Sequence, residues 1–234
     1  MRAGRSRCLR GGVAVTFEAV HLAPIGARDA LLVADIQYDF LPGGALGVRD
    51  GDAVIEPIAA ILPRFATVVL TQDFHPPGHV SFASAHPGKA PFQTIDLPGG
   101  PQALWPDHCL AGSHGAELHE RLRSPALDRH VTLVFRKGTH RDTDSYSAFR
   151  ENAGARGRRA STGLGPWLSA REIERVFVVG LARDYCVAWS ALDARAEGFA
   201  CVVVDSCTRA VFPDTSARTD EELRRAGVTI AGSL

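Results

Sequence analysis

The stretch ALLVAD, residues 30–35, carries the pattern that decides the fold: an unbroken apolar run followed by one acidic residue. Short apolar runs of this kind are typical of strands buried on both faces of a parallel sheet. Similar runs follow at 66–70, 131–135, 176–179, 200–204 and 228–231. Helix-compatible stretches lie between them, at 52–64, 116–123, 165–174, 186–197 and 215–226. This alternation predicts a doubly wound parallel α/β sheet.

Composition limits the class of protein. The chain has 234 residues, enough for one large α/β domain, and we find no linker that would divide it. Lys and Arg number 26 and Asp and Glu number 26, so the net charge is zero and indicates no nucleic-acid partner. There is no apolar run long enough to span a membrane. Five cysteines, an odd number, do not suggest a disulfide framework, and we expect a reducing, cytoplasmic location.

Three segments fit neither strand nor helix. Residues 1–28 begin with four arginines within ten residues, and we interpret them as a basic, poorly ordered extension ahead of a single domain at 29–234. Residues 73–115, which are rich in proline, and residues 138–162 are long loops. Long loops inside a compact domain are usually functional.

The residues after the apolar runs are chemically complementary. Asp35 follows the first run, Asp73 and His75 come soon after the second, Lys137 follows the third, and Cys186 comes after the fourth. Because ligands bind at the carboxyl ends of the strands in open parallel sheets, these groups are expected to meet at one edge.

Cys186 is the candidate nucleophile. It begins a helix-compatible run, and the amides at a helix N-terminus favour the thiolate and can stabilise an oxyanion. Asp35 is then the candidate base, with its pKa raised by burial, and Lys137 would hold the charges of Asp35 and the thiolate together. The remaining cysteines are interpreted as packing residues or as part of the extension.

Asp73 and His75 also suggest a metal site, since residues two apart in an extended segment can face the same way. His108, in a proline-stiffened loop, is a third candidate ligand, and His79 and His86 could replace or supplement it. One Asp and two His would leave open positions for water and substrate, as in catalytic metal sites.

Several motifs together resemble one known family. They are DIQYDF (35–40), TQDFH (71–75), WPDHC (105–109), Lys137-Gly138 and GLARDYCV (180–187). This combination is similar to the nicotinamidase/pyrazinamidase branch of the isochorismatase-like cysteine hydrolases, over residues 29–230. The resemblance implies a six-stranded parallel α/β/α sandwich. It also implies hydrolysis of nicotinamide, and of pyrazinamide-type amides, to the acid and ammonia through a thioester, within NAD salvage.

The resemblance assigns roles to residues. It implies Cys186, Asp35 and Lys137 as the catalytic set, and Asp73, His75 and His108 as ligands of one divalent metal ion, Zn, Fe or Mn, with His79 as a further candidate ligand. The substrate-binding residues that it implies are Phe40, Trp105, Tyr146 and Ala182. The amides of Ala182 and Cys186 correspond to an oxyanion hole, with a cis peptide expected between Leu181 and Ala182.

The sequence leaves alternatives open. A relative that acts on another amide, such as an N-carbamoyl compound, or on a vinyl ether such as isochorismate, would generally lack the Asp and His ligands. A binding module that has kept the fold would not need the catalytic set. Arg183 stands where the family commonly has a small polar residue, and it could alter the charge of the pocket or an interface. The interpretation also leaves room for a homo-oligomer.

Overall fold

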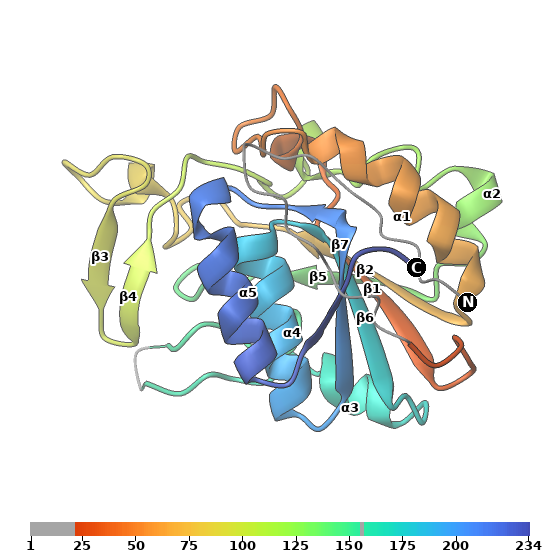
Figure 1. The fold of residues 1–234 in the computed structure, drawn as a ribbon. Coiled ribbons are helices and arrows are strands. Elements are labelled where there is room, and N and C mark those ends of the chain that lie inside the picture. The colour runs from red at the N-terminus through yellow and green to blue at the C-terminus, as the bar shows by residue number, and fades with distance from the viewer. Residues whose placement is uncertain (1–21, 155–156) are drawn as a thin grey trace.

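The computed structural model describes residues 22–154 and 157–234, and a six-stranded parallel sheet forms its centre (Figure 1). The strands, in spatial order, are β5 (Leu133–Lys137), β2 (Thr67–Asp73), β1 (Asp29–Ala34), β6 (Arg175–Leu181), β7 (Ala200–Arg209) and β8 (Thr229–Ala231). Every pairing in this sheet is parallel, which confirms the predicted architecture. The strand order reverses between β1 and β6, so the topological switch point lies between these two strands.

Helices cover both faces of the sheet (Figure 1). One face packs against α1 (Ile55–Ile61) and the short α2 (Pro125–Asp128), and the other packs against α3 (Leu164–Ser169), α4 (Ala188–Ala196) and α5 (Ser216–Arg225). Along β1, alternate residues enter the two cores: Leu31 and Val33 face α1, whereas Ala30 and Leu32 face α4. The apolar run is therefore buried on both sides, as the sequence predicted.

Most predicted helices are present with changed ends. The segment 52–64 is helical in three pieces, because 3₁₀ turns at Gly51–Val54 and Leu62–Arg64 flank α1. The helix predicted at 165–174 is shorter and ends at Ser169. Cys186 does not open an α-helix directly; it lies in a π-helical turn, Arg183–Val187, that continues into α4.

The helix predicted at 116–123 is wrong. Several of its backbone groups bond to other segments, and the bonds within it, from Leu122 N–H to the His119 carbonyl and from Arg123 N–H to the Glu120 carbonyl, are those of turns. The Ala116 carbonyl accepts from the side chain of Gln37 at 2.8 Å, and the His119 N–H donates to the Ile36 carbonyl at 2.8 Å. An isolated bridge also pairs Gln37 with Leu118. Residues 117–119 are therefore held beside the residues that follow β1, and residues 120–123 form turns.

The loop 73–115 contains a hairpin that the sequence analysis missed. Strands β3 (Thr94–Leu97) and β4 (Gly100–Ala103) pair in antiparallel fashion around a Pro98-Gly99 turn. The hairpin projects from the body of the domain (Figure 1). Its strands have four residues each, of which only Gln102 is buried, so they lack the apolar pattern that marks the central strands.

Most of the predicted basic extension lies outside the described residues. Its last part, 22–28, is described and contacts the domain: Leu22 and Ile25 pack against the core, and the Arg28 carbonyl accepts from the Glu174 N–H at 2.9 Å. Contacts with the domain thus begin before residue 29. Among the helices of the described part, none has the length and apolarity needed to cross a membrane.

Candidate active site

Four adjacent strands bring together the three predicted catalytic residues and the predicted metal ligand Asp73. Asp35 follows β1, Asp73 ends β2, Lys137 ends β5, and Cys186 lies in the turn after β6. All four side chains are buried. The side-chain ligand atoms of Asp35, Asp73 and Cys186 lie within 4.8 Å of one another. The sheet topology therefore assembles the cluster that the strand ends predicted.

Lys137 is at the centre of this cluster. Its Nζ lies 2.9 Å from Asp35 Oδ2 and donates to Asp73 Oδ1 at 2.5 Å, to the Ser145 carbonyl at 3.1 Å and to Cys186 Sγ at 3.4 Å. Burial alone would lower the pKa of Lys137, but the two carboxylates outweigh it and raise that pKa well above its usual value. The ammonium is therefore charged, and it links both carboxylates to the thiol.

Asp35 is held by Thr71, whose hydroxyl donates to Asp35 Oδ1 at 2.6 Å. Its backbone φ is 50°, an unusual value for a residue other than glycine, which turns the chain sharply at the end of β1. Burial raises the pKa of Asp35, and the charge of Lys137 opposes that rise only in part. A carboxylate with a raised pKa is suited to accept a proton from a thiol.

The turn that carries Cys186 depends on close backbone packing. Gly180 has a φ of 107°, and a Cβ there would lie 2.1 Å from the Ala34 carbonyl oxygen, so only glycine fits beside β1. The peptide between Leu181 and Ala182 is cis, as expected. The Ala182 carbonyl then accepts from the N–H groups of Tyr185 at 3.0 Å and Val187 at 3.1 Å. Burial raises the pKa of Cys186, and Lys137 counteracts this rise only in part. Without substrate, Cys186 is therefore a protonated thiol.

Three imidazoles lie beside the catalytic cluster. The His75 and His108 rings have centroids 4.9 Å apart, and His79 stacks on His75 at 4.2 Å. Each ring has a protein partner at Nδ1. His75 Nδ1 lies 2.8 Å from the Gly138 carbonyl oxygen, His108 Nδ1 lies 2.8 Å from the Pro106 carbonyl oxygen, and His79 Nδ1 lies 2.7 Å from the Ser81 hydroxyl. The Nε2 of His79 is buried with no hydrogen-bond partner, and the Nε2 of His75 lies 3.6 Å from Asp73 Oδ2.

This donor set fits a divalent cation. Ligand atoms of Asp73, His75 and His108 lie within 4.8 Å of one another, as do those of His75, His79 and Asp144. Metal-binding histidines commonly donate their other ring N–H to a carbonyl, as His75 and His108 can. Burial lowers the pKa of His79 and of His108 to about 4, so both rings are neutral and able to bind a metal at neutral pH.

The pKa values of Asp73 and His75 shift in the sense expected of a charged pair. Burial would raise the pKa of Asp73, but Lys137 and His75 outweigh it and lower that pKa below its usual value. Burial likewise opposes the charged form of His75, and Asp73 outweighs it, so the pKa of His75 is raised. Asp73 is therefore ionised and carries negative charge toward both Lys137 and the imidazoles.

A small aromatic pocket opens beside Cys186. All four predicted substrate-binding residues line it: Phe40, Trp105, Tyr146 and Ala182. The Trp105 Nε1–H donates to the Tyr146 hydroxyl at 3.2 Å, which fixes two of the rings. Asp73 and His108 lie in the same lining, so the pocket joins the thiol to the candidate metal ligands.

Several contributing residues were not predicted. Tyr185 lines the pocket from inside the Cys186 motif. Gln37 clamps the backbone of Asp73, because its Nε2 donates to the Asp73 carbonyl and its Oε1 accepts from the Asp73 N–H, both at 2.8 Å. Asp144 is buried and accepts from Gln102 Nε2 at 2.9 Å. Polar residues inside the motifs 35–40 and 180–187 were the available signal for Gln37 and Tyr185, whereas Asp144 lies in a loop that carries no such signal.

Arg183 does not enter the pocket. Its guanidinium donates to Thr208 Oγ1 at 2.8 Å and to Asp220 Oδ1 at 2.6 and 2.9 Å, and it lies 3.2 Å from Asp205 Oδ1. It thus ties the turn that carries the nucleophile to β7 and α5. The charge of Arg183 is therefore balanced by Asp205 and Asp220, outside the pocket.

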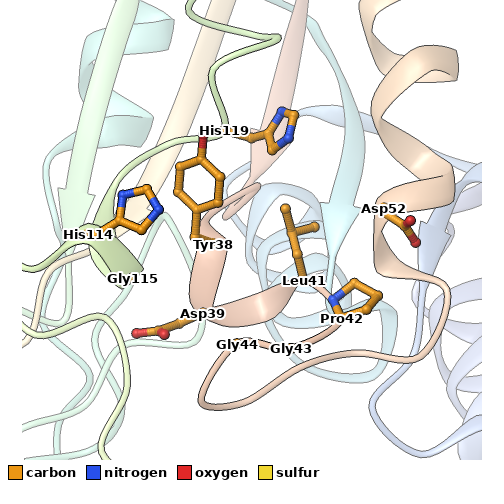
Figure 2. Close-up of a pocket in the computed structure, with 10 residues that line it drawn as sticks. All are labelled: Tyr38, Asp39, Leu41, Pro42, Gly43, Gly44, Asp52, His114, Gly115 and His119. Carbon is orange, nitrogen blue, oxygen red and sulfur yellow. The ribbon is translucent and has the colours of Figure 1, made fainter.

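A larger cavity, about 480 Å³, lies elsewhere on the domain (Figure 2). Figure 2 shows Tyr38 between His114 and His119 on one side of it, with Asp39 below. Its lining contains none of the predicted catalytic or metal-binding residues. Asp39 accepts from the Cys109 N–H at 2.7 Å, so this carboxylate holds the loop that carries His108. The reactive groups belong to the smaller cavity.

Comparison with known proteins identifies the family. The family model of the isochorismatase domain matches residues 29–233 of this chain. The nicotinamidase of Acinetobacter baylyi is 46% identical over 200 residues, which cover 85% of this chain and 90% of that protein. The structure of the Acinetobacter baumannii nicotinamidase and pyrazinamidase superposes with a TM-score of 0.82 at 43% identity, covering 88% of this chain and 96% of that one.

A more distant structure has metal in it. The pyrazinamidase of Pyrococcus horikoshii in complex with zinc gives a TM-score of 0.69 at 31% identity, covering 87% of this chain and 98% of that one. Both the family match and these relatives span almost the whole described domain. The chain belongs to the isochorismatase family, in its nicotinamidase/pyrazinamidase branch.

Proposed function

We infer that the protein hydrolyses nicotinamide to nicotinate and ammonia, with Cys186 as nucleophile, and that it accepts pyrazinamide-type amides. One observation carries the proposal: a buried ammonium, Lys137 Nζ, lies within 3.4 Å of Cys186 Sγ and also contacts Asp35 and Asp73. A thiol, a proton acceptor and a fixed cation beside an aromatic pocket are the groups that amide hydrolysis by a cysteine requires. The nicotinate would enter NAD salvage.

The first half of the reaction forms a thioester. Asp35 accepts the proton of the Cys186 thiol as Sγ attacks the carboxamide carbon, and negative charge develops on the amide oxygen. The N–H groups of Ala182 and Cys186 would stabilise this oxyanion. Asp35 then returns the proton to the amide nitrogen, the C–N bond breaks, and ammonia leaves.

The second half regenerates the thiol. Asp35 accepts a proton from water, whose oxygen attacks the thioester carbon. The C–S bond breaks, the acid is released, and the proton returns to Sγ. Lys137 remains an ammonium throughout, because the carboxylates that surround it raise its pKa. Its charge holds the carboxylate of Asp35 and the thiolate of Cys186 in one buried site.

We further propose that Asp73, His75 and His108 hold one divalent metal ion, with His79 as an additional ligand. The free Nε2 of buried His79, beside two imidazoles whose Nδ1 atoms face carbonyls, supports this proposal, as does the zinc in the Pyrococcus relative. Such an ion would bind the ring nitrogen of the pyridine and activate water. Zn, Fe and Mn all suit this donor set.

The test is ammonia release from nicotinamide by the metal-loaded full chain, with isochorismate and an N-carbamoyl amino acid assayed in parallel. Cys186→Ala is expected to lower turnover of nicotinamide by about four orders of magnitude or more, while nicotinate binding remains measurable. Cys201→Ala is the matched control, since Cys201 is a buried thiol in β7, away from the pocket lining. Retained turnover in Cys186→Ala, or preference for either alternative substrate, would contradict the proposal.

The remaining proposals concern context. We propose that residues 29–234 form one hydrolase domain, because a single sheet is built from residues 29 to 231. We propose a cytoplasmic location, because a catalytic thiol needs reducing surroundings. The homo-oligomer stays a prediction, which light scattering would test.

A further inference from the structure

The pocket beside Cys186 is narrow. Its cavity measures about 30 Å³. Cys186 is 6% exposed, and the flanking Trp105 is 4% exposed. A cavity of this size leaves little room for an aromatic ring with a carboxamide. Access of such a substrate to the thiol therefore depends on movement of the side chains in and around the pocket wall.

Two exposed aromatic side chains contact residues that line the pocket: Phe92 contacts Trp105, and Phe212 contacts Tyr185. Phe92 is 57% exposed and Phe212 is 37% exposed, and they are the only exposed large hydrophobic residues in the part of the chain that the structure describes. Instead of being scattered, they contact each other edge to face, with ring centroids 6.1 Å apart. Two exposed apolar rings that meet next to residues of the pocket wall suggest a functional contact.

The two phenylalanines complete a circuit of four rings. Phe92 lies 6.0 Å from Trp105, Trp105 lies 4.8 Å from Tyr185, and Tyr185 lies 6.4 Å from Phe212. Trp105 and Tyr185 line the pocket beside Cys186. The inner half of the circuit thus belongs to the pocket wall, with Trp105 buried and Tyr185 part-buried, and the outer half faces solvent.

The outer rings are mounted on separate supports. The carboxylate of Asp184 accepts from the N–H groups of Val211 and Phe212, both at 2.9 Å, so the Phe212 backbone is tied to the turn that carries Cys186. The Phe92 N–H donates to the Leu104 carbonyl at 2.6 Å, which ties it to the segment that leads into Trp105. The ring contact between Phe92 and Phe212 therefore spans from one support to the other.

Phe92 also has an unusual backbone. Its φ is 70°, in the left-handed region that non-glycine residues rarely adopt. A bulky residue keeps such a conformation only where its surroundings impose it, and these outliers gather at functional sites. Here the residue with this conformation places its ring against Phe212.

We propose that Phe92 and Phe212 form a gate that controls access to Cys186 by size, admitting planar single-ring amides and hindering larger ones. The proposal rests on the proposed function of this pocket. Because the supports of both rings are fixed by backbone hydrogen bonds, the gate opens by movement of two exposed side chains, without unfolding of either loop. An edge-to-face contact between exposed rings is weak enough to open and close often during turnover.

The direct test is the rate at which Cys186 is alkylated by two reagents with the same reactive group. Iodoacetamide is the small reagent, and N-(1-naphthyl)iodoacetamide is the large one. The metal-loaded full chain is treated under pseudo-first-order conditions, and mass spectrometry of the peptide containing Cys186 excludes signal from other thiols. In Phe92→Ala and in Phe212→Ala the rate with the large reagent is expected to rise about three- to tenfold, the factor that loss of one aromatic contact confers on an opening equilibrium.

The small reagent is expected to gain less than the large one, because it needs a narrower opening. The double variant should exceed the faster single variant only slightly, since either substitution already removes the same contact. Phe92→Leu keeps an apolar side chain without a ring and should behave as Phe92→Ala does. Trp167→Ala is the control: Trp167 is a part-buried aromatic residue of α3 that packs away from the pocket, and its variant should leave both rates unchanged.

Two results would overturn the gate: an unchanged rate with the large reagent in both phenylalanine variants, or an equal rise for both reagents. As a substrate readout, the ratio of kcat/KM for quinoline-3-carboxamide to that for nicotinamide should rise in the same variants. Turnover of nicotinamide by the unmodified protein is measured alongside. Turnover without size-selective alkylation refutes the gate alone, whereas size-selective alkylation without turnover refutes the proposed function alone.

Discussion

Two buried cations lie close to the nucleophile, and they do different work. The side chains of Lys137 and Arg183 are 1% and 4% exposed, and each contacts two carboxylates. Arg183 is three residues from Cys186 in sequence, but its guanidinium extends to β7 and α5. Lys137 is far from Cys186 in sequence, but its ammonium contacts the sulfur.

The two cations differ in the groups that they contact. The planar guanidinium of Arg183 contacts only oxygen atoms, of Asp205, Thr208 and Asp220, and these contacts hold the backbone segments together. Lys137 divides a compact charge among two carboxylates and a thiol, and a proton can move between two of these groups. A cation close to the nucleophile in sequence is thus not necessarily catalytic. A cation that contacts both the nucleophile and its proton acceptor is the better candidate.

The largest effect should follow removal of the Lys137 charge. In Lys137→Met the adjacent carboxylates of Asp35 and Asp73 would have no ammonium, and two buried carboxylates this close do not both ionise readily. Asp35 would then hold a proton and could not accept that of the thiol. We expect kcat for nicotinamide to fall by about 10²- to 10⁴-fold. Steady-state ammonia release measures it.

Lys89, the chain's other lysine, supplies the control because it is exposed in the loop before β3. Lys89→Met should keep the kcat of the unmodified protein. A Lys137→Met protein that folds, as judged by circular dichroism, and retains more than a tenth of the turnover would remove Lys137 from the mechanism.

A smaller effect, on stability and not on chemistry, is expected for Arg183→Met. The substitution leaves Asp205 and Asp220 without their cation, and breaking a buried ion pair costs about 3–5 kcal/mol. Asp205 is 28% exposed, which favours the low end of that range. Urea unfolding should show the loss, while kcat per active site stays close to that of the unmodified protein.

Arg183→Lys makes this comparison sharper, since it keeps the charge and loses the planar fork. Its stability should fall between those of Arg183→Met and the unmodified protein. If kcat per active site fell as far in Arg183→Met as in Lys137→Met, the division between a structural and a catalytic cation would be wrong.

The smallest effect should come from an exposed cation on the same helix that holds Asp220. Arg225 pairs with Glu221 at 2.8 Å, and both side chains are more than 70% exposed. Water and salt screen such pairs, so Arg225→Gln should change the free energy of unfolding by less than about 1 kcal/mol. Urea unfolding measures it beside Arg183→Met, and a loss as large as that of Arg183→Met would show that burial does not set the difference.

The sheet was predictable because its strands are buried on both faces. An apolar run such as 30–34 indicates a strand that is covered on both faces. The residues that follow such strands lie at the edge of the sheet where the site forms. The segment 116–123 has a helix-compatible composition, but its backbone pairs with residues 36–38, a long-range contact that local propensity does not encode. The hairpin at 94–103 is short, and Gln102 is the one buried residue of its strands, so no run of apolar residues marks it.

The site was predictable where residues follow strands and less so where they lie in loops. Asp35, Asp73 and Lys137 have positions that the sheet itself fixes. Asp144 lies in the loop 138–162, and only the folded chain brings it near His75 and His79. Arg183 was expected to affect the pocket or an interface, and its true direction depends on Asp205 and Asp220, which no local pattern connects to it.

The strand order has a consequence for how activity reports on the molecule. Lys137, Asp73, Asp35 and Cys186 come from β5, β2, β1 and β6, which lie side by side although their residues span most of the chain. A slip of one residue in any of these strands would turn its side chains to the opposite face. Cys186 therefore becomes a nucleophile only after all four strands have paired in register. Turnover consequently measures correct assembly of the sheet, because a partly folded chain has no activity.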